Sequence, residues 1–343
     1  MFSGCTWLHA LPFLCSNSSP PPAKLSCPSF PMATYVRIAI VGDVHDEWNL
    51  EDDTKALQLL KPDLVLFTGR CSVPLCDFGN ENVDLVRSIS KLEFVKAIIL
   101  GNHDAWSTQK FSAREKDAVQ LQLECLGDEH VGYKRLDFPN LKSSIIGGRP
   151  FSCGGNQLYR KKLLTARYGV RDMDGSAERI YKAALGTPAD HSVVFLAHNG
   201  PTGLGSNVDD ICGRDWIHGG GDHGDPDLAQ ALSKLKETTN LSVTLVVFGH
   251  MHKRLAYGNG LRKMIVVGDD NTIYLNGAIV PRVKTMSNEV MTLNSEGTLR
   301  GFTVADIIDG NLDKIAETWV SVLGDNATIE SEHILYSKAT RGL

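Results

Sequence analysis

Short apolar runs, each ending in a glycine or a polar cluster, recur along the chain. The first run, residues 36–41, is rich in β-branched side chains and is followed by Gly42. Such a run is typical of a buried β-strand that ends in a loop. The same pattern predicts five strands, at residues 36–41, 64–68, 97–100, 193–197 and 243–248.

Segments with helical periodicity lie between these strands. They span residues 53–60, 83–92, 113–125 and 227–235. Alternation of strands with helices predicts an α/β fold. In such folds ligands bind beyond the carboxyl ends of the strands, and the polar clusters of this chain fall at those ends.

The last third of the chain has strand-like runs without helices between them. Turn sequences such as Asp309-Gly310-Asn311 separate these runs, and we expect them to form a second, antiparallel or mixed sheet. Two packed mixed β-sheets flanked by helices would give a four-layer α/β/β/α sandwich. The runs are residues 263–267, 272–275, 278–283, 301–308 and 314–322.

Three segments define the predicted domain organisation. Residues 34–343 form the folded domain, and residues 105–190 are too long for an ordinary connection, so we expect a cap or insert over the site. Residues 1–33 contain no Asp or Glu and are rich in Ser, Pro and Cys. This composition predicts a disordered leader of the transit-peptide type, and its scarcity of Arg favours a chloroplast address. A secretory signal, an untargeted cytoplasmic tail and a start at Met32 are the alternatives.

Composition narrows the class of protein. With 42% apolar and 22% charged residues the chain has the balance of a globular protein, and no stretch reaches the roughly 18 apolar residues of a membrane span. A net charge of −5 argues against a nucleic-acid partner, because binding to the phosphate backbone needs a basic face. The eight cysteines follow no framework pattern, which indicates a reducing compartment. Composition gives no oligomeric state.

Side chains that bind metals follow four of the predicted strands. Carboxylate, amide and imidazole ligands together suit divalent Mn, Fe or Zn. Two such ions about 3.5 to 4 Å apart can activate a shared water and bind a phosphoryl group. The clusters are Asp43-Val-His45, Gly-Asn102-His103-Asp104, His198, and Gly-His250-Met-His252.

This ordered series resembles the calcineurin-like metallophosphoesterase superfamily, with members of plant or cyanobacterial type, over residues 36–255. The resemblance implies a phosphoester hydrolase (a phosphatase in the broad sense) with a dinuclear metal centre. It also implies two sets of metal ligands: one ion is held by Asp43, His45 and His252, and the other by Asn102, His198 and His250. By the same resemblance His103 protonates the leaving-group oxygen or stabilises the phosphoryl charge, and Asp104 orients His103.

The bridging aspartate departs from the family pattern. The family has Gly-Asp directly after the second strand, whereas here Arg70 follows Gly69. Removal of residues 70–76 would bring Asp77 next to Gly69 and restore the motif. We therefore interpret residues 70–76 as an insert and Asp77 as the bridging ligand. In the alternative interpretation the insert displaces Asp77, and the protein is a catalytically silent binding or scaffold protein with the same fold.

Three further residues are candidate substrate contacts. Arg149 lies in a Gly-Gly-Arg-Pro segment, and His218 and His223 flank a glycine-rich stretch. A turn after a strand is the alternative for Arg149, and an N-cap of the next helix is the alternative role of that stretch, through Asp225 or Asp227. The substrate is a phosphoester that the sequence does not identify. A nuclease of the same superfamily is a third reading, which the acidic net charge disfavours.

Overall fold

The computed structural model describes residues 34–44, 47–69, 81–110, 115–257, 259–286 and 297–341. By its internal contacts the chain divides into Met1–Met32 and Ala33–Leu343, and all described residues lie in the second unit. The predicted ligands His45 and Asp77, the insert 70–76 and the leader 1–33 lie outside the described residues. None of the described helices is both long and apolar enough to cross a membrane.

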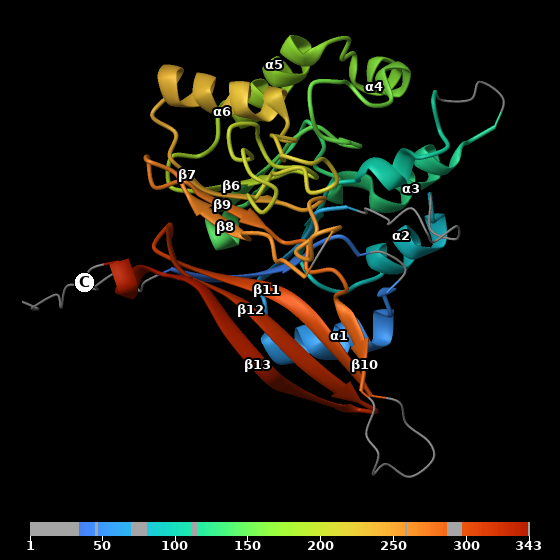
Figure 1. Cartoon of the computed structure of the whole chain (residues 1–343), viewed down its shortest axis with the longest axis vertical. Helices are drawn as coiled ribbons and strands as arrows, with labels where there is room; N and C mark the ends of the chain where they lie inside the picture. Colours follow the sequence, from blue (N-terminus) through green and yellow to red (C-terminus); the bar gives the residue numbers. More distant parts are fainter. Residues whose placement is uncertain are drawn as a thin grey trace, which may run out of the picture. The chain divides into compact units, whose positions relative to one another are not determined.

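A seven-stranded sheet forms one layer of the second unit (Figure 1). Its order is β13-β12-β11-β1-β2-β3, and β10 pairs with β11. The strands β1, β2 and β3 are parallel, and the C-terminal strands add to β1 in antiparallel fashion. The bounds are β1 Tyr35–Val41, β2 Leu64–Phe67, β3 Lys96–Ile98, β10 Val283–Thr285, β11 Thr298–Ile308, β12 Asn311–Leu323 and β13 Asn326–Ser337.

A six-stranded sheet forms the next layer, in the order β4-β5-β6-β7-β9-β8. The four central strands are parallel, and the edge strands β4 and β8 are antiparallel to their neighbours. The bounds are β4 Arg135–Phe138, β5 Ser143–Gly147, β6 Ser192–Leu196, β7 Val243–Phe248, β8 Ile265–Val267 and β9 Ile273–Asn276.

Helices cover the outer faces of both sheets. Figure 1 shows α4, α5 and α6 beyond the six-stranded sheet, and α1 on the outer side of the seven-stranded sheet, where it contacts β12 and β13. The α-helices are α1 Leu50–Leu60, α2 Val83–Ser90, α3 Ala118–Leu126, α4 Lys161–Tyr168, α5 Met173–Ala184 and α6 Pro226–Thr238. The described 3-10 helices are η2 Asn102–Ala105, η3 Gly127–Glu129, η4 Pro139–Leu141 and η5 Lys338–Arg341.

Strand alternation explains the layers. In β1, Ile38 and Ile40 belong to the core between the two sheets, whereas Ala39 and Val41 belong to the core beneath the helices. Successive side chains of a strand point to opposite faces, so a strand that is buried on both faces serves two cores. The predicted four-layer sandwich of two mixed sheets flanked by helices is confirmed.

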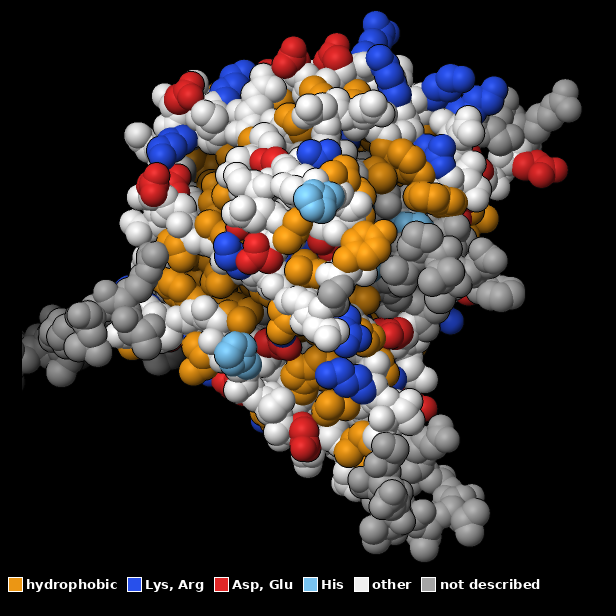
Figure 2. All heavy atoms as spheres, in the orientation of Figure 1, with side chains coloured by type: hydrophobic (Ala, Val, Ile, Leu, Met, Phe, Trp, Pro, Cys, Tyr) orange, Lys and Arg blue, Asp and Glu red, His pale blue; other side chains and the backbone are white. Residues whose placement is uncertain are grey.

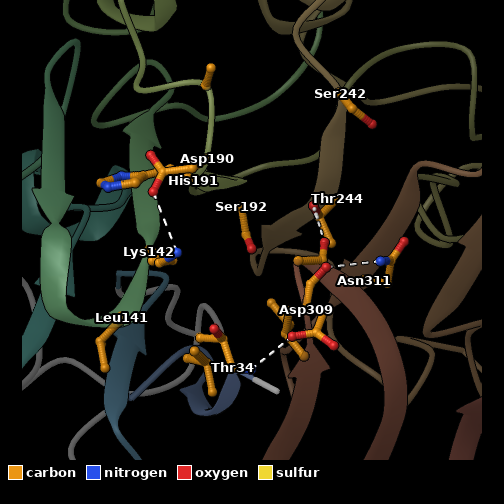
Figure 3. Close-up of a pocket in the computed structure, with 14 residues that line it drawn as sticks. Thr34, Leu141, Lys142, Asp190, His191, Ser192, Ser242, Thr244, Asp309 and Asn311 are labelled. Carbon is orange, nitrogen blue, oxygen red and sulfur yellow. Dashed lines mark hydrogen bonds and ion pairs between the residues drawn. The ribbon is translucent and has the colours of Figure 1, made fainter. Parts of the chain in front are cut away.

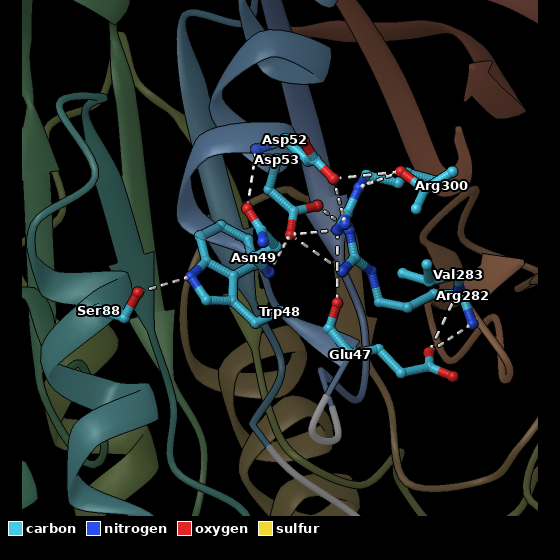
Figure 4. Close-up of polar contacts among 10 residues, drawn as sticks. Glu47, Trp48, Asn49, Asp52, Asp53, Ser88, Arg282, Val283 and Arg300 are labelled. Carbon is cyan, nitrogen blue, oxygen red and sulfur yellow. Dashed lines mark hydrogen bonds and ion pairs between the residues drawn. The ribbon is translucent and has the colours of Figure 1, made fainter. Parts of the chain in front are cut away.

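A buried ion-pair cluster fixes α1 to the C-terminal strands (Figure 4). Asp53 of α1 is fully buried and binds Arg282 at 2.5 Å and Arg300 at 2.8 Å. Arg300 also binds Asp52 at 2.9 Å. Because buried charges must be paired, this cluster defines where α1 sits on the sheet.

The C-terminal third differs from the prediction. Its strands do not form a sheet of their own: β8 and β9 join the six-stranded sheet, and β10 to β13 join the seven-stranded one. Residues 278–282 form no strand, and the long strand β13 was not predicted. A separate C-terminal sheet does not form, because the five strands predicted first are themselves divided, with β1 to β3 in one sheet and β6 and β7 in the other, and the C-terminal strands extend both sheets.

Within residues 105–190, β4 and β5 are part of the six-stranded sheet, and α5 packs on β5 and α6. These elements are thus built into the sandwich. A cap function for the rest of this segment stays a prediction.

Candidate metal centre

The carboxyl ends of strands from both sheets meet at one place. Nδ1 of His198, after β6, donates a hydrogen bond to the Thr68 carbonyl at the end of β2, at 2.7 Å. Its Nε2 lies 2.9 Å from Oδ1 of Asn102, after β3. Asp43, after β1, accepts a hydrogen bond from the backbone N–H of His250, after β7, at 3.1 Å. Polar residues from five strand ends therefore share one site.

The predicted ligands pack closely within this site. His252 Nε2 lies 3.6 Å from Asp43 Oδ2, and the rings of His198 and His250 are 5.0 Å apart, centroid to centroid. Asp43 and His250 have left-handed backbones, with φ of 37° and 67°. Non-glycine residues in this conformation are strained and cluster at functional sites. The backbone thus holds both side chains in positions that an ordinary turn would not give them.

Glycine permits the close approach of the two sheets. A Cβ on Gly249 would lie 2.3 Å from Thr68 Oγ1 and 2.7 Å from Asp43 Oδ1. No other residue fits between β7 and the end of β2 without displacing Asp43. The Gly-His-Met-His motif therefore needs its glycine for packing as well as its histidines for chemistry.

Burial sets the charge of the site. It raises the pKa of the Asp43 carboxyl to about 7, with a smaller contribution from Asp104. It lowers the pKa of His198 to about 3, that of His252 to about 4, and that of His250 well below its usual range. The imidazoles are therefore neutral at pH 7, which is the form that binds metals.

The residues present fit a metal ion. Oδ2 of Asp43 and Nδ1 of His250 are buried and make no hydrogen bond within the described residues. Buried polar atoms normally have partners, and a divalent cation would supply them.

The described part of the chain holds no group of three or more His, Cys, Asp or Glu residues that could bind a metal by itself. Each predicted set contributes only two such described residues: Asp43 and His252 to one, His198 and His250 to the other. The remaining ligands of these sets are Asn102, an amide, and His45 and Asp77, which lie outside the described residues.

His103 and Asp104 lie at the same site, in η2. Both are buried, and Asp104 accepts a hydrogen bond from the backbone N–H of Gly101 at 2.7 Å. The Trp106 ring stacks on the His103 ring, with centroids 4.4 Å apart and an interplanar angle of 2°. The catalytic roles of His103 and Asp104 stay predictions.

The three candidate substrate contacts differ in position. Arg149 is 1% exposed and binds Asp225 at 2.7 Å and Asp227 at 2.9 Å, so its guanidinium is occupied by buried carboxylates and does not face a substrate. His218 lies in an exposed turn. The His223 ring stacks 5.9 Å from the His250 ring, which places it beside the metal centre. Substrate contact by His218 or His223 stays a prediction.

Asp225 occupies the N-cap position of α6, but its side chain caps no backbone N–H. Instead it accepts hydrogen bonds from Arg149 and from Ser152 Oγ, the latter at 2.6 Å. Burial raises the pKa of the Asp225 carboxyl, and Arg149 lowers it in part.

Sequence reasoning missed several residues that shape the site. Cys153 Sγ accepts a hydrogen bond from Asn102 Nδ2 at 3.8 Å, which turns the amide oxygen toward His198. Trp216 packs edge-on against His223, with centroids 4.8 Å apart. Trp106 carries a signal in the sequence, since it closely follows the Gly-Asn-His-Asp motif. Cys153 and Trp216 carry none, because only the fold brings them to the site.

A cavity of about 460 Å³ lies elsewhere, at the amino ends of β1, β6 and β7 (Figure 3). Thr34, Lys142, Asp190, Ser192 and Asn311 are among its lining residues, and none of the predicted site residues that the structure describes lines it. It belongs to the opposite strand ends and is not the metal centre.

Comparison with known families agrees with this geometry. The model of the calcineurin-like phosphoesterase family matches residues 36–254, which is more than half of the chain. The protein belongs to this family, whose members generally use divalent metal ions to hydrolyse phosphoesters.

Among solved structures, the chain is similar to a conserved uncharacterized protein, a predicted phosphoesterase, from Streptococcus pneumoniae TIGR4. The identity is 11%, the match covers 88% of this chain and 98% of that chain, and the TM-score is 0.30. No curated protein matches the chain significantly.

Proposed function

We propose that the protein hydrolyses a phosphoester with a water bridged between two divalent ions, Mn, Fe or Zn. The observation that carries this proposal is the meeting of Asp43, Asn102, His198 and His250 at the carboxyl ends of strands from both sheets. These are the positions where the family motifs place metal ligands. Bound ions would lower the pKa of the water and stabilise charge on the phosphoryl group.

Each residue has a proposed role. Asp43, His45 and His252 hold one ion, and Asn102, His198 and His250 hold the other. The Thr68 carbonyl orients the His198 ring from behind, since it accepts from Nδ1 when Nε2 binds the metal. Asp77 bridges the two ions. His103 donates a proton to the leaving-group oxygen, and Asp104 braces the turn that carries it.

The ends of the segment that contains Asp77 support its role. A Cβ on Gly69 would lie 2.6 Å from the backbone N of Gly101. At the other end the backbone N–H of Glu81 donates to the His103 carbonyl at 3.0 Å, and Glu81 Oε1 accepts from the N–H of Ser107 at 2.8 Å. Both ends thus lie beside Asn102, one of the proposed ligands. Loop closure entropy grows only slowly with length, so seven extra residues need not move Asp77 away.

The insert 70–76 also favours one alternative, a scaffold protein that keeps the fold without the chemistry. If the insert holds Asp77 away from the site, two cations would lack the carboxylate between them, and metal binding would weaken. We also propose that residues 1–33 direct the protein to the chloroplast, on the strength of their composition.

The test measures hydrolysis of 4-nitrophenyl phosphate, a monoester, and bis(4-nitrophenyl) phosphate, a diester, with manganese added. The full chain is compared with the same chain lacking residues 70–76. Activity in both supports the bridging role of Asp77. Activity in the deletion alone shows that the insert silences an enzyme site, and silence in both, with no metal bound, contradicts the proposal.

Two variants separate the roles within the site. His250→Ala should lose bound metal and activity together, whereas His103→Ala should keep its metal and lose about 100-fold or more in turnover. His333→Ala, at an exposed position of β13, is the matched control and should keep both. A fully metallated and active His250→Ala variant would refute the site.

A further inference from the structure

A second pocket lies where the carboxyl ends of α3 and α4 approach α5. Its volume is about 240 Å³. Three cationic side chains line it, from Lys134, Arg167 and Arg179, and none of the described residues that line it is acidic. None of the described residues of the metal centre lines this pocket, so it is a separate feature of the described fold.

The three cations are available to a ligand. All three are exposed, and none forms an ion pair with another described residue. Arg167 lies near Glu124 and helps to lower the pKa of that carboxyl, but the ion pair of Glu124 is with Lys116, at 2.6 Å. The Arg179 guanidinium lies 6.0 Å from the centroid of the Tyr133 ring. No ion pair within the described residues therefore neutralises the three cations at the pocket.

The floor of the pocket has polar atoms without partners. His130 is only 3% exposed, and its Nε2 makes no hydrogen bond within the described residues. The hydroxyl of Tyr168, on a residue that is 8% exposed, lies near the Arg167 guanidinium, which partly offsets the rise in its pKa caused by burial, and forms no hydrogen bond of good geometry within the described residues. Leaving such atoms unpaired costs free energy, and natural proteins rarely do so without a ligand or water.

The backbone at Gly132 and Tyr133 leaves room for the His130 ring. Tyr133 has a left-handed backbone with φ of 56°, which is strained for an aromatic residue. A Cβ on Gly132 would lie 2.7 Å from Cε1 of His130, so only glycine leaves the imidazole in place.

The carboxyl ends of α3 and α4 repel an anion, and this repulsion can be compared with the attraction of the cationic side chains. The carboxyl ends of α3 and α4 each carry about half an elementary negative charge. The three full positive charges of the side chains outweigh these two partial negative charges. Arg and Lys also donate hydrogen bonds to oxyanions, and Arg does so with the planar geometry that fits phosphate.

We infer that this pocket binds a phosphate-class oxyanion, with Arg167, Arg179 and Lys134 around its charge and with His130 and Tyr168 contacting its oxygens. A volume several times the roughly 30 Å³ share of a water molecule has room for a phosphoryl group and a small substituent. The inference does not depend on the proposed function, because no residue is shared.

The experiment is a titration of the full chain with inorganic phosphate, followed by NMR of ¹⁵N-labelled histidine side chains. The His130 signal, assigned with His130→Gln, should shift in a saturable way. The double variant Arg167→Gln/Arg179→Gln should weaken this binding by about tenfold or more. Binding at the metal centre would instead shift His198 and His250, so the two sites are distinguished.

Lys161→Gln/Lys162→Gln is the matched control. Figure 2 shows Lys and Arg side chains gathered over α4, and this pair removes two charges there from residues that do not line the pocket. It should leave the affinity unchanged. An equal loss in the control would mean nonspecific attraction, and an absent or unsaturable His130 shift would also overturn the inference.

Methylphosphonate, which cannot be hydrolysed, distinguishes the source of the oxyanion. Tighter binding than that of inorganic phosphate indicates an organic phosphate, and equal or weaker binding indicates inorganic phosphate. Both results support the site. Failure of inorganic phosphate to move the His130 signal contradicts it.

Discussion

Replacement of Arg149 by methionine tests whether this residue supports the fold or binds the substrate. Its guanidinium is 1% exposed and lies 2.7 Å from Asp225 and 2.9 Å from Asp227. Methionine keeps the aliphatic volume and removes the charge. Asp225 and Asp227 would then face each other without a cation in a dry environment.

The expected loss follows from these contacts. Two unit charges about 4 Å apart, roughly the distance between the charge centres of such an ion pair, attract each other by about 4 kcal/mol at an effective dielectric constant of about 20. Part of that attraction offsets the desolvation of the three charges. Removal of one partner from a buried pair costs about 3–5 kcal/mol, because the other charges stay buried. We expect Arg149→Met to lower the free energy of unfolding by that amount.

Urea unfolding monitored by circular dichroism measures this loss, and hydrolysis of 4-nitrophenyl phosphate measures the effect on KM. The control is Arg171→Met, the same change at an exposed position, with an expected effect below about 0.5 kcal/mol. A variant that unfolds within about 1 kcal/mol of the parent but has a sharply raised KM would refute this reasoning and assign Arg149 to the substrate.

Three other changes test separate parts of the structure. Burial lowers the pKa of His130 to about 3, so the neutral imidazole contributes its full stability above about pH 6.5, and this contribution is lost as the pH falls. Between pH 7 and pH 5 in phosphate-free buffer, the free energy of unfolding of the parent should fall by about 2 kcal/mol more than that of His130→Gln. Equal changes in the urea unfolding curves of the two proteins would contradict this. Asp53→Asn leaves two buried arginines short of a carboxylate and should cost about 3–5 kcal/mol in urea, against no change for His333→Gln. Trp106→Ala removes the ring that stacks on His103 and should reduce turnover of alkyl phosphates about 2- to 10-fold, and turnover of 4-nitrophenyl phosphate by less. Trp106→Phe should stay close to the parent. Equal losses on both substrates would exclude a role in leaving-group protonation.

The strands around the metal centre could be predicted because they are buried on both faces. Such strands are continuous apolar runs, and the predicted runs coincide with β1, β2, β3, β6 and β7 to within two residues at each end. The polar clusters that follow them then mark the site without further information. His198 and Asn102 were assigned to one ion from the motif series, and the structure places them in contact.

The strand β13 could not be predicted in this way. Its residues from Thr328 to Ile334 are all exposed, and β13 is held by backbone pairing with β12. A strand of this kind has no apolar run to identify it. Its sheet is also a long-range property, since β11 reaches β1 across more than half of the chain.

Arg149 shows why the role of a charged residue depends on the fold. Its partners Asp225 and Asp227 follow it by more than seventy residues, and each was a candidate helix cap in the sequence. The Gly-Gly-Arg-Pro segment suggests an accessible turn. Only the packing of α6 against the segment after β5 reveals that two carboxylates already occupy the guanidinium.

Distance in the sequence is likewise a poor guide to whether Asp77 reaches the metals. Gly69 packs against Gly101, and the backbone N–H of Glu81 donates to the carbonyl of His103, so the two described ends of this segment lie on either side of Asn102. Asp77 precedes Glu81 by four residues (81 − 77), and an extended chain of that length spans at most about 14 Å. The fixed end that matters for Asp77 is therefore Glu81 rather than Gly69. Deletion of residues 70–76 shortens the path from Gly69 and leaves the path from Glu81 intact, so activity in both forms would mean that the anchor at Glu81 is sufficient to place the bridging carboxylate.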